Sequence, residues 1–139
     1  MERAQTLLEF DRFGILPTAQ RLEIAQVLLE RPQHLSAEQI IERLREIGSR
    51  VSKATVYNTL KLFGERGLVG ECIVDPERRF YDSNTEPHHH FYNVDSGRLT
   101  DIPRHDITLD GIPEFPKGVH LDQVEVLIKV RNTPAKDLP

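Results

Sequence analysis

One helix of this 139-residue chain opens with Ser52-Lys53-Ala54-Thr55-Val56-Tyr57-Asn58. Its first residue is a typical N-cap, and Gly67 is placed to end it. Apolar residues at helical spacing define an inner face: Val56, Leu60 and Phe63. The other face carries hydroxyl, amide and basic groups, which are the groups that a DNA recognition helix presents to phosphates and base edges.

Two more helices and a hairpin are predicted around this helix. Residues 20–30 carry a broad apolar stripe that is closed by Pro32. Ser36-Ala37-Glu38-Gln39 is a capping box that opens the next helix. Strands are predicted over 68–74 and 79–82, joined by a turn that begins Asp75-Pro76. A helix-turn-helix followed by a hairpin predicts a winged-helix domain over residues 1–82.

A second, smaller domain is predicted over residues 88–139. The polar segment 83–87 ends in proline and is interpreted as a hinge linker. Residues 90–94 and 98–102 flank Asp95-Ser96-Gly97 and indicate a hairpin, and residues 123–131 alternate like a strand. Its apolar face would carry Val124, Val126, Ile128 and Val130. The fold class is therefore α+β, with an N-terminal winged helix-turn-helix domain and a C-terminal α/β dimerisation domain.

Homodimerisation is predicted because the second domain has few apolar residues with which to build a core. A small sheet of this kind completes its core against another copy of itself. Between the hairpin and the last strand, residues 106–118 hold two prolines and two glycines, which indicates a loop or a single helical turn. Residues 133–139 are expected to form a frayed tail.

The amino-acid composition indicates the cellular compartment and limits the classes of binding partner. Cys72 is the only cysteine, so an intramolecular disulfide and a cysteine-rich zinc site are excluded, and a reducing cytoplasm is expected. No apolar run is long enough to cross a membrane. The net charge of −4 argues weakly against nucleic acid, yet residues 47–64 contain no acidic residue. Candidate contacts to double-stranded operator DNA are Arg21, Arg50, Ser52, Lys53, Thr55, Tyr57, Asn58 and Lys61.

Metal-ligand chemistry is concentrated in His88-His89-His90, with Asp82 before it and Asp101 after it. Neutral imidazoles combined with carboxylates suit Fe(II), Mn(II), Zn(II) or Co(II). Strand alternation would put His88 and His90 on one face and His89 on the other, so the run divides between two candidate sites. His105 is a candidate partner of His89 in a second metal site. The competing interpretation is a solvated polar turn or a purification tag.

These motifs together resemble the ferric uptake regulator (Fur) family of bacterial metal-responsive repressors. The resemblance extends from about residue 17 to residue 102. It rests on Pro17-Thr18-Ala19-Gln20-Arg21, His34-Leu35-Ser36-Ala37, Ala54-Thr55-Val56-Tyr57-Asn58-Thr59-Leu60, Gly67-Leu68-Val69, the histidine run and residues 97–101. The resemblance implies a regulatory metal between the two domains. Its implied hinge ligands are His34, Asp82, His88, His90 and Asp101.

Departures from the family pattern point to particular branches. Many members hold a structural zinc with two Cys-x-x-Cys pairs, but the first pair falls on Asn93 and Ser96 and there is no second pair, so this zinc is expected to be absent. At the family's second metal site Val124 stands where a histidine is common. The triple histidine and the missing cysteines are similar to the iron-responsive, haem-binding Irr branch, although Ile73 follows Cys72 and no Cys-Pro haem signal exists.

Aspartate at both acidic hinge positions, Asp82 and Asp101, is similar to the peroxide-sensing branch. Leu16 stands where a basic residue usual in the family makes a minor-groove contact.

The leading hypothesis is a metal-dependent dimeric transcription factor that uses Fe(II) or Mn(II), with Zn(II) able to bind in vitro, to regulate iron, manganese or peroxide response genes. A haem-responsive Irr-type regulator is the main alternative. A metal-buffering or haem-binding module without DNA contact is disfavoured by the recognition-like helix. A non-haem iron oxygenase is disfavoured because so small a chain offers few apolar residues for a closed pocket, so the chain is not expected to be an enzyme.

Overall fold

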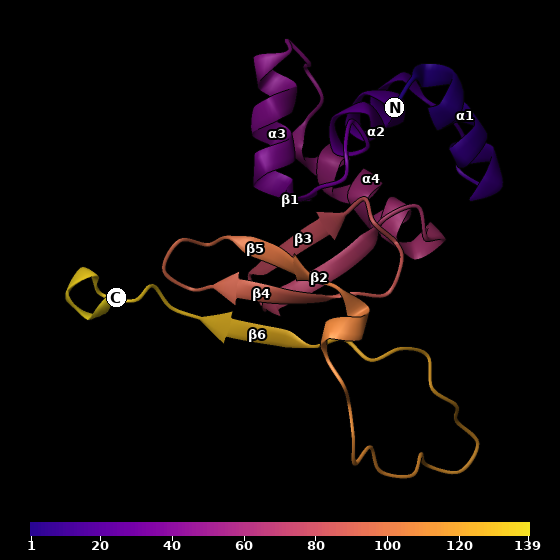
Figure 1. Ribbon diagram of the computed structural model, residues 1–139. Helices are drawn as coiled ribbons and strands as arrows, with labels where there is room; N and C mark the ends of the chain where they lie inside the picture. The colour runs from indigo at the N-terminus through magenta and orange to yellow at the C-terminus, as the bar shows by residue number, and fades with distance from the viewer. The chain divides into compact units, whose positions relative to one another are not determined.

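The computed structural model describes all residues from 1 to 139, and the chain divides into two compact units, Met1–Thr85 and Glu86–Pro139 (Figure 1). The boundary falls within the segment 83–87 that was predicted as a linker. None of the helices is both long and apolar enough to cross a membrane.

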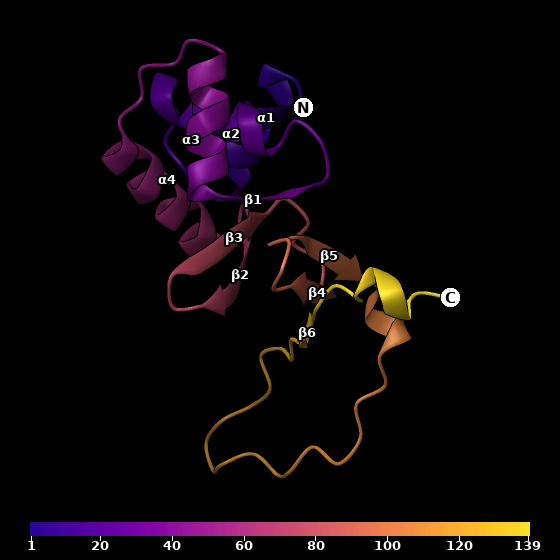
Figure 2. The same cartoon turned by 90° about the vertical axis from the view of Figure 1, so that its left-hand side faces the viewer.

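Four helices form most of the first unit, namely α1 Arg3–Arg12, α2 Ala19–Leu28, α3 Ala37–Glu46 and α4 Lys53–Arg66. The last three are the predicted helices, and Figure 2 shows them grouped together. Sequence reasoning missed α1, because few of its residues are buried: Thr6 and Phe10. Phe10 is nonetheless central to the core, since its ring lies 5.5 Å from that of Phe63 in α4.

Local capping fixes where these helices begin and end. The Ser36 hydroxyl accepts from the Gln39 N–H at 3.2 Å and the Gln39 side chain accepts from the Ser36 N–H at 2.9 Å, so the predicted capping box of α3 is confirmed. The Ser52 hydroxyl accepts from the Thr55 N–H at 3.2 Å and caps α4. Gly67 ends α4 with φ +83°, a left-handed conformation that favours glycine.

The sheet of the first unit has the order β1-β3-β2. The predicted hairpin is present as β2 Gly70–Asp75 and β3 Arg78–Asp82. Sequence reasoning missed β1 His34–Ser36, which pairs with β3 in an antiparallel register that sets His34 opposite Asp82. This added strand carries one of the implied metal ligands to the end of the hairpin.

The second unit holds a three-stranded sheet of order β5-β4-β6, formed by β4 His89–Asn93, β5 Leu99–Ile102 and β6 Leu127–Val130. β5 is antiparallel to β4 and β6 is parallel to it. Short 3-10 turns lie at Arg104–Asp106 and Ala135–Asp137. The predicted strand 123–131 is therefore too long, because pairing with β4 begins only at Leu127, opposite His90.

Much of the second unit's apolar surface is uncovered within one chain. Its buried hydrophobic residues are Tyr92, Leu99 and Ile102. Residues 107–126 form an open segment with little regular structure, as predicted for 106–118 (Figures 1 and 2). Exposed large hydrophobic side chains follow one another along it: Leu109, Ile112, Phe115, Val119, Leu121 and Val124. This is the surface that a small domain would bury against another chain.

Candidate metal centre and nucleic-acid interface

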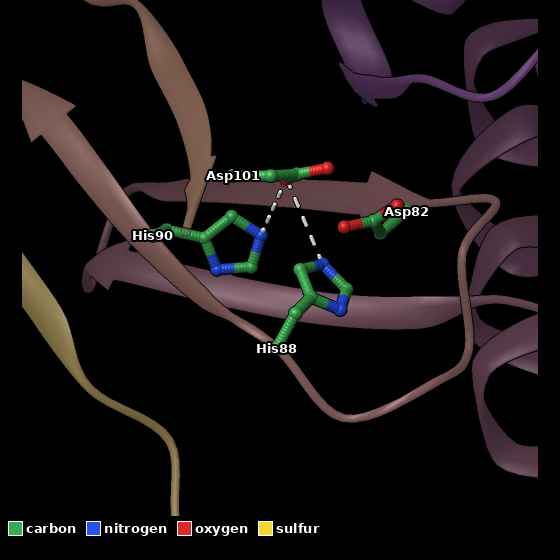
Figure 3. A group of neighbouring side chains, drawn as sticks. All are labelled: Asp82, His88, His90 and Asp101. Atoms are coloured by element: carbon green, nitrogen blue, oxygen red, sulfur yellow. Dashed lines mark ion pairs between the residues drawn. The ribbon is translucent and has the colours of Figure 1, made fainter. Parts of the chain in front are cut away.

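Three of the predicted ligands come together within the second unit. Antiparallel pairing of β4 with β5 puts Asp101 directly opposite His90, whose Nε2 lies 3.3 Å from the Asp101 Oδ1. His88 Nε2 lies 3.7 Å from the same oxygen, and the two imidazole rings are 4.6 Å apart. Figure 3 shows both rings directed at the carboxylate of Asp101.

A backbone carbonyl orients the His88 ring. His88 Nδ1 lies 2.5 Å from the Glu86 carbonyl oxygen, which can only accept, so Nδ1 carries a proton. In the neutral imidazole the lone pair is then on Nε2, and Nε2 is the nitrogen on the Asp101 side. Metal-binding histidines commonly donate their other N–H to a carbonyl in this way.

The donor set fits a divalent cation. One ligand atom from each of His88, His90 and Asp101 lies within 4.8 Å of the others. Two neutral imidazole nitrogens and one carboxylate oxygen suit Fe(II), Mn(II) or Zn(II), and no thiolate is present to select a softer ion.

The middle histidine of the run is used in the sheet. His89 is buried, and its Nδ1 accepts from the Val126 N–H at 2.9 Å, which ties β4 to the start of β6. His105 is exposed and lies 3.3 Å from its neighbour Asp106. Neither His89 nor His105 belongs to the group of potential metal ligands formed around Asp101.

The first unit holds the remaining two predicted ligands. His34 and Asp82 are opposite one another in β1 and β3. The Asp82 Oδ1 accepts from the Asn84 N–H at 2.9 Å, and the His34 ring packs edge-on against Phe80, with 6.2 Å between centroids. Asp82, which Figure 3 also labels, is thus placed by the wing hairpin of its own unit.

Most of the predicted DNA contacts lie on α4 or just before it. A groove runs between the start of α2 and α4, and polar residues line much of it: Thr18, Gln20, Arg21, Thr55, Asn58 and Thr59. The Arg21 guanidinium donates to the Leu16 carbonyl at 2.8 Å, which holds the arginine beside this groove. The structure therefore brings Arg21, Thr55 and Asn58 together on one surface.

Glu38 is a neighbour of this surface that sequence reasoning missed. The half-exposed Tyr57 hydroxyl donates to the Glu38 carboxylate in the first turn of α3. This hydrogen bond, with smaller contributions from burial and from the carboxylate's charge, raises the pKa of the Tyr57 phenol. Glu38 was interpreted only as part of a capping box, and no local signal reveals a partner in another helix.

Comparison with known proteins decides the family. The sequence model of the ferric uptake regulator family matches residues 13–128. The chain belongs to this family.

The Fur-family relatives and structures support the same assignment. The peroxide-responsive repressor PerR of Staphylococcus epidermidis is 27% identical over 118 residues, which is 85% of this chain and 77% of that protein. The ferric uptake regulator of Pseudomonas aeruginosa with manganese gives a TM-score of 0.70 at 25% identity, covering 92% of this chain and 98% of that one. The Vibrio cholerae regulator gives 0.72 at 21% identity, covering 91% and 99%, and supports the fold.

A hydrogen-bonded network occupies the place where many Fur-family proteins carry a zinc-binding Cys-x-x-Cys pair. The Asn93 Oδ1 accepts from the N–H groups of Asp95 at 2.9 Å and Ser96 at 3.0 Å. Its Nδ2 donates to the Asn132 Oδ1 at 2.7 Å, and the Asp95 carboxylate accepts from the Asn132 N–H at 2.9 Å. The hairpin turn is thereby joined to the segment after β6 through polar side chains.

The three adjacent histidines should respond differently to substitution. His88→Ala or His90→Ala should lower Mn(II) affinity by more than about tenfold, because each removes a ligand nitrogen. His89→Ala should change Mn(II) affinity little and should lower stability by about 1–3 kcal/mol, since the Val126 N–H loses its acceptor. Calorimetric titration and thermal unfolding measure the two effects. An equal loss of metal affinity in all three variants would contradict this division.

Proposed function

We propose that this chain is a metal-dependent, dimeric DNA-binding repressor in which one Fe(II) or Mn(II) ion joins the two units. The observation that carries the proposal is the cluster of His88, His90 and Asp101 at the start of the second unit. His34 and Asp82 form a second donor pair at the end of the first unit. Ligand sets immediately on both sides of the boundary are what a hinge metal requires.

Chain connectivity favours a shared ion. Asp82 precedes His88 by only the five residues 83–87, which can span at most about 20 Å when fully extended. A bound divalent ion would supply a positive centre that attracts the two carboxylates and both sets of imidazoles. An ion that binds both donor sets favours conformations in which they meet, and so restricts the position of each recognition helix.

Binding of operator DNA is assigned to α4 and the start of α2. The α4 face offers Lys53 and Lys61 to phosphates, and Asn58 to the edge of an adenine. The acidic net charge of −4 reduces non-specific attraction to DNA, so the local basic groups act only when the helices are correctly placed. Such a regulator works in the cytoplasm.

Homodimerisation is assigned to the second unit, because its exposed apolar segment and small core need a covering surface. The matching relatives are named as regulators and repressors, which agrees with a chain that is not an enzyme. Haem remains the alternative signal, with no Cys-Pro sequence to support it, because Ile73 follows Cys72. Titration of haem into the protein–operator complex tests that alternative directly.

Operator binding should require the metal. His90→Ala should weaken Mn(II)-dependent operator binding by about tenfold or more, because it removes a ligand from the cluster. A gel shift with Mn(II) and with chelator measures the effect, and circular dichroism checks the fold.

His105→Ala is the matched control for this experiment, because His105 is exposed and lies outside the cluster. It should bind the operator as the wild type does. Tight binding of the His90→Ala variant in chelator would refute the metal-dependent mechanism.

Dimerisation should not depend on a metal. Strong chelators should leave the dimer intact, because the turn after β4 is joined to the segment after β6 by Asn93, Asp95 and Asn132 instead of thiolates. Light scattering before and after chelation tests this point. Asn93→Ala should lower the thermal unfolding midpoint in either condition. Dissociation to monomers on chelation alone would show that a metal supports the interface.

Peroxide should inactivate the Fe(II) form. The relatives named peroxide-responsive, together with aspartate at positions 82 and 101, support this branch. Fe(II) reduces hydrogen peroxide and Mn(II) does not, so brief exposure should add oxygen to His34 or His88 only in the Fe(II) protein, with loss of operator binding. Mass spectrometry of the histidine peptides measures it. Unmodified histidine peptides together with retained DNA binding would refute peroxide sensing and leave regulation by metal or haem alone.

A further inference from the structure

Gln33 lies between α2 and β1, and its side-chain amide is fully engaged. The Nε2 donates to the carbonyls of Val27 at 2.9 Å and Leu28 at 3.1 Å. These carbonyls belong to the last turn of α2, where backbone oxygens lack partners within the helix. The Oε1 accepts from the Arg43 guanidinium of α3 at 2.9 Å. One side chain therefore joins the end of α2 to the side of α3.

The backbone of the same residue extends the pairing that holds the two ligands of the first unit. The Gln33 N–H donates to the Ser83 hydroxyl at 2.9 Å, and the Ser83 N–H donates to the Gln33 carbonyl at 2.9 Å. Gln33 directly precedes His34 and Ser83 directly follows Asp82. The hydrogen bonds of Gln33, here called the Gln33 clamp, thus lie directly before β1 and directly after β3, next to the paired residues His34 and Asp82.

We infer that Gln33 is a positioning residue that transmits metal binding at His34 and Asp82 to the helical body that carries α4. β1 has three residues and pairs with a single neighbouring strand, so few ladder hydrogen bonds hold its first residue, His34. The rest of the strand is fixed separately, by burial of Leu35 and by Ser36, which caps α3. With Gln33 bound to α2, α3 and Ser83, the helices move together with the ligands. This inference rests on the proposed function.

A simpler role for Gln33 would be to cap α2 and nothing more. Loss of a cap would destabilise the first unit and weaken DNA binding equally with and without metal. Loss of transmission would instead lower the ratio of the two operator affinities. We call the ratio of operator affinity with metal to operator affinity without metal the coupling factor. A purely structural defect changes both affinities equally and leaves this ratio unchanged, so the ratio distinguishes the two roles.

The test uses the full-length protein and Mn(II). For wild type and Gln33→Ala, operator Kd is measured at saturating Mn(II) and in chelator, and Mn(II) affinity is measured without DNA. Gln33→Ala should lower the coupling factor by about tenfold, within the range by which single residues alter coupling, while Mn(II) still binds. Hydrogen exchange of the β1 amides in the metal-free protein should become faster, a readout that needs no metal.

Gln39→Ala is the matched control. Gln39 is also a glutamine of the first unit whose side chain binds a backbone group, since it accepts a hydrogen bond from the Ser36 N–H. It lies in the first turn of α3, the helix that also contains Arg43. Gln39→Ala should retain the wild-type coupling factor. Arg43→Met removes only the α3 arm of the clamp and should lower the factor partly, so the inference is testable even if Gln33→Ala fails to fold.

Two outcomes overturn the inference in distinguishable ways. If wild type responds to Mn(II) and the folded Gln33 and Arg43 variants keep the full coupling factor, Gln33 is only a cap and the proposed function stands. If wild-type operator binding is indifferent to Mn(II), the proposed function fails and the inference fails with it.

Discussion

The antiparallel pairing of β1 with β3 is the interaction on which the functional arrangement of the first unit depends. It sets His34, which lies between two helices in the sequence, opposite Asp82 at the end of the wing hairpin. The same pairing helps to close the core, because the next pair in the register, Leu35 opposite Tyr81, is buried. One short strand therefore serves both packing and ligand placement. Because the two proposed ligands share a ladder, their spacing is fixed by hydrogen-bond register and needs no metal to define it.

Three consecutive histidines at the start of β4 make two different kinds of contact, because side chains alternate along the chain. The side chains at 88 and 90 meet Asp101, while the ring at 89 accepts a hydrogen bond from the backbone at the start of β6. The candidate metal site and a buried sheet contact are thus built from one residue type, because successive side chains point to opposite faces.

The parts of the fold that sequence predicted are those with local causes. Caps at Ser36 and Ser52, the ending glycine of α4 and the Asp-Pro turn all act within a few residues, and each was found where expected. Features missed by sequence depend on distant partners. β1 is too short to show alternation, α1 buries only one large side chain, and Glu38 acquires its role from a tyrosine in another helix. β6 was overestimated because alternation continues beyond the residues that β4 can pair.

The polar turn of the second unit changes how a bound metal would contribute to folding. Where thiolates hold a structural zinc, the free energy of metal binding is part of the free energy of folding, and loss of the ion unfolds the site. Here the turn at Asn93 and the segment at Asn132 are held by neutral and charged hydrogen bonds within the chain. A typical hydrogen bond contributes only about 1 kcal/mol net to the free energy of folding, so several hydrogen bonds are needed to replace one bound ion. Under the proposed function, the free energy of metal binding at the imidazole and carboxylate cluster would then be available to change the relative populations of conformations, because folding of this turn does not consume it.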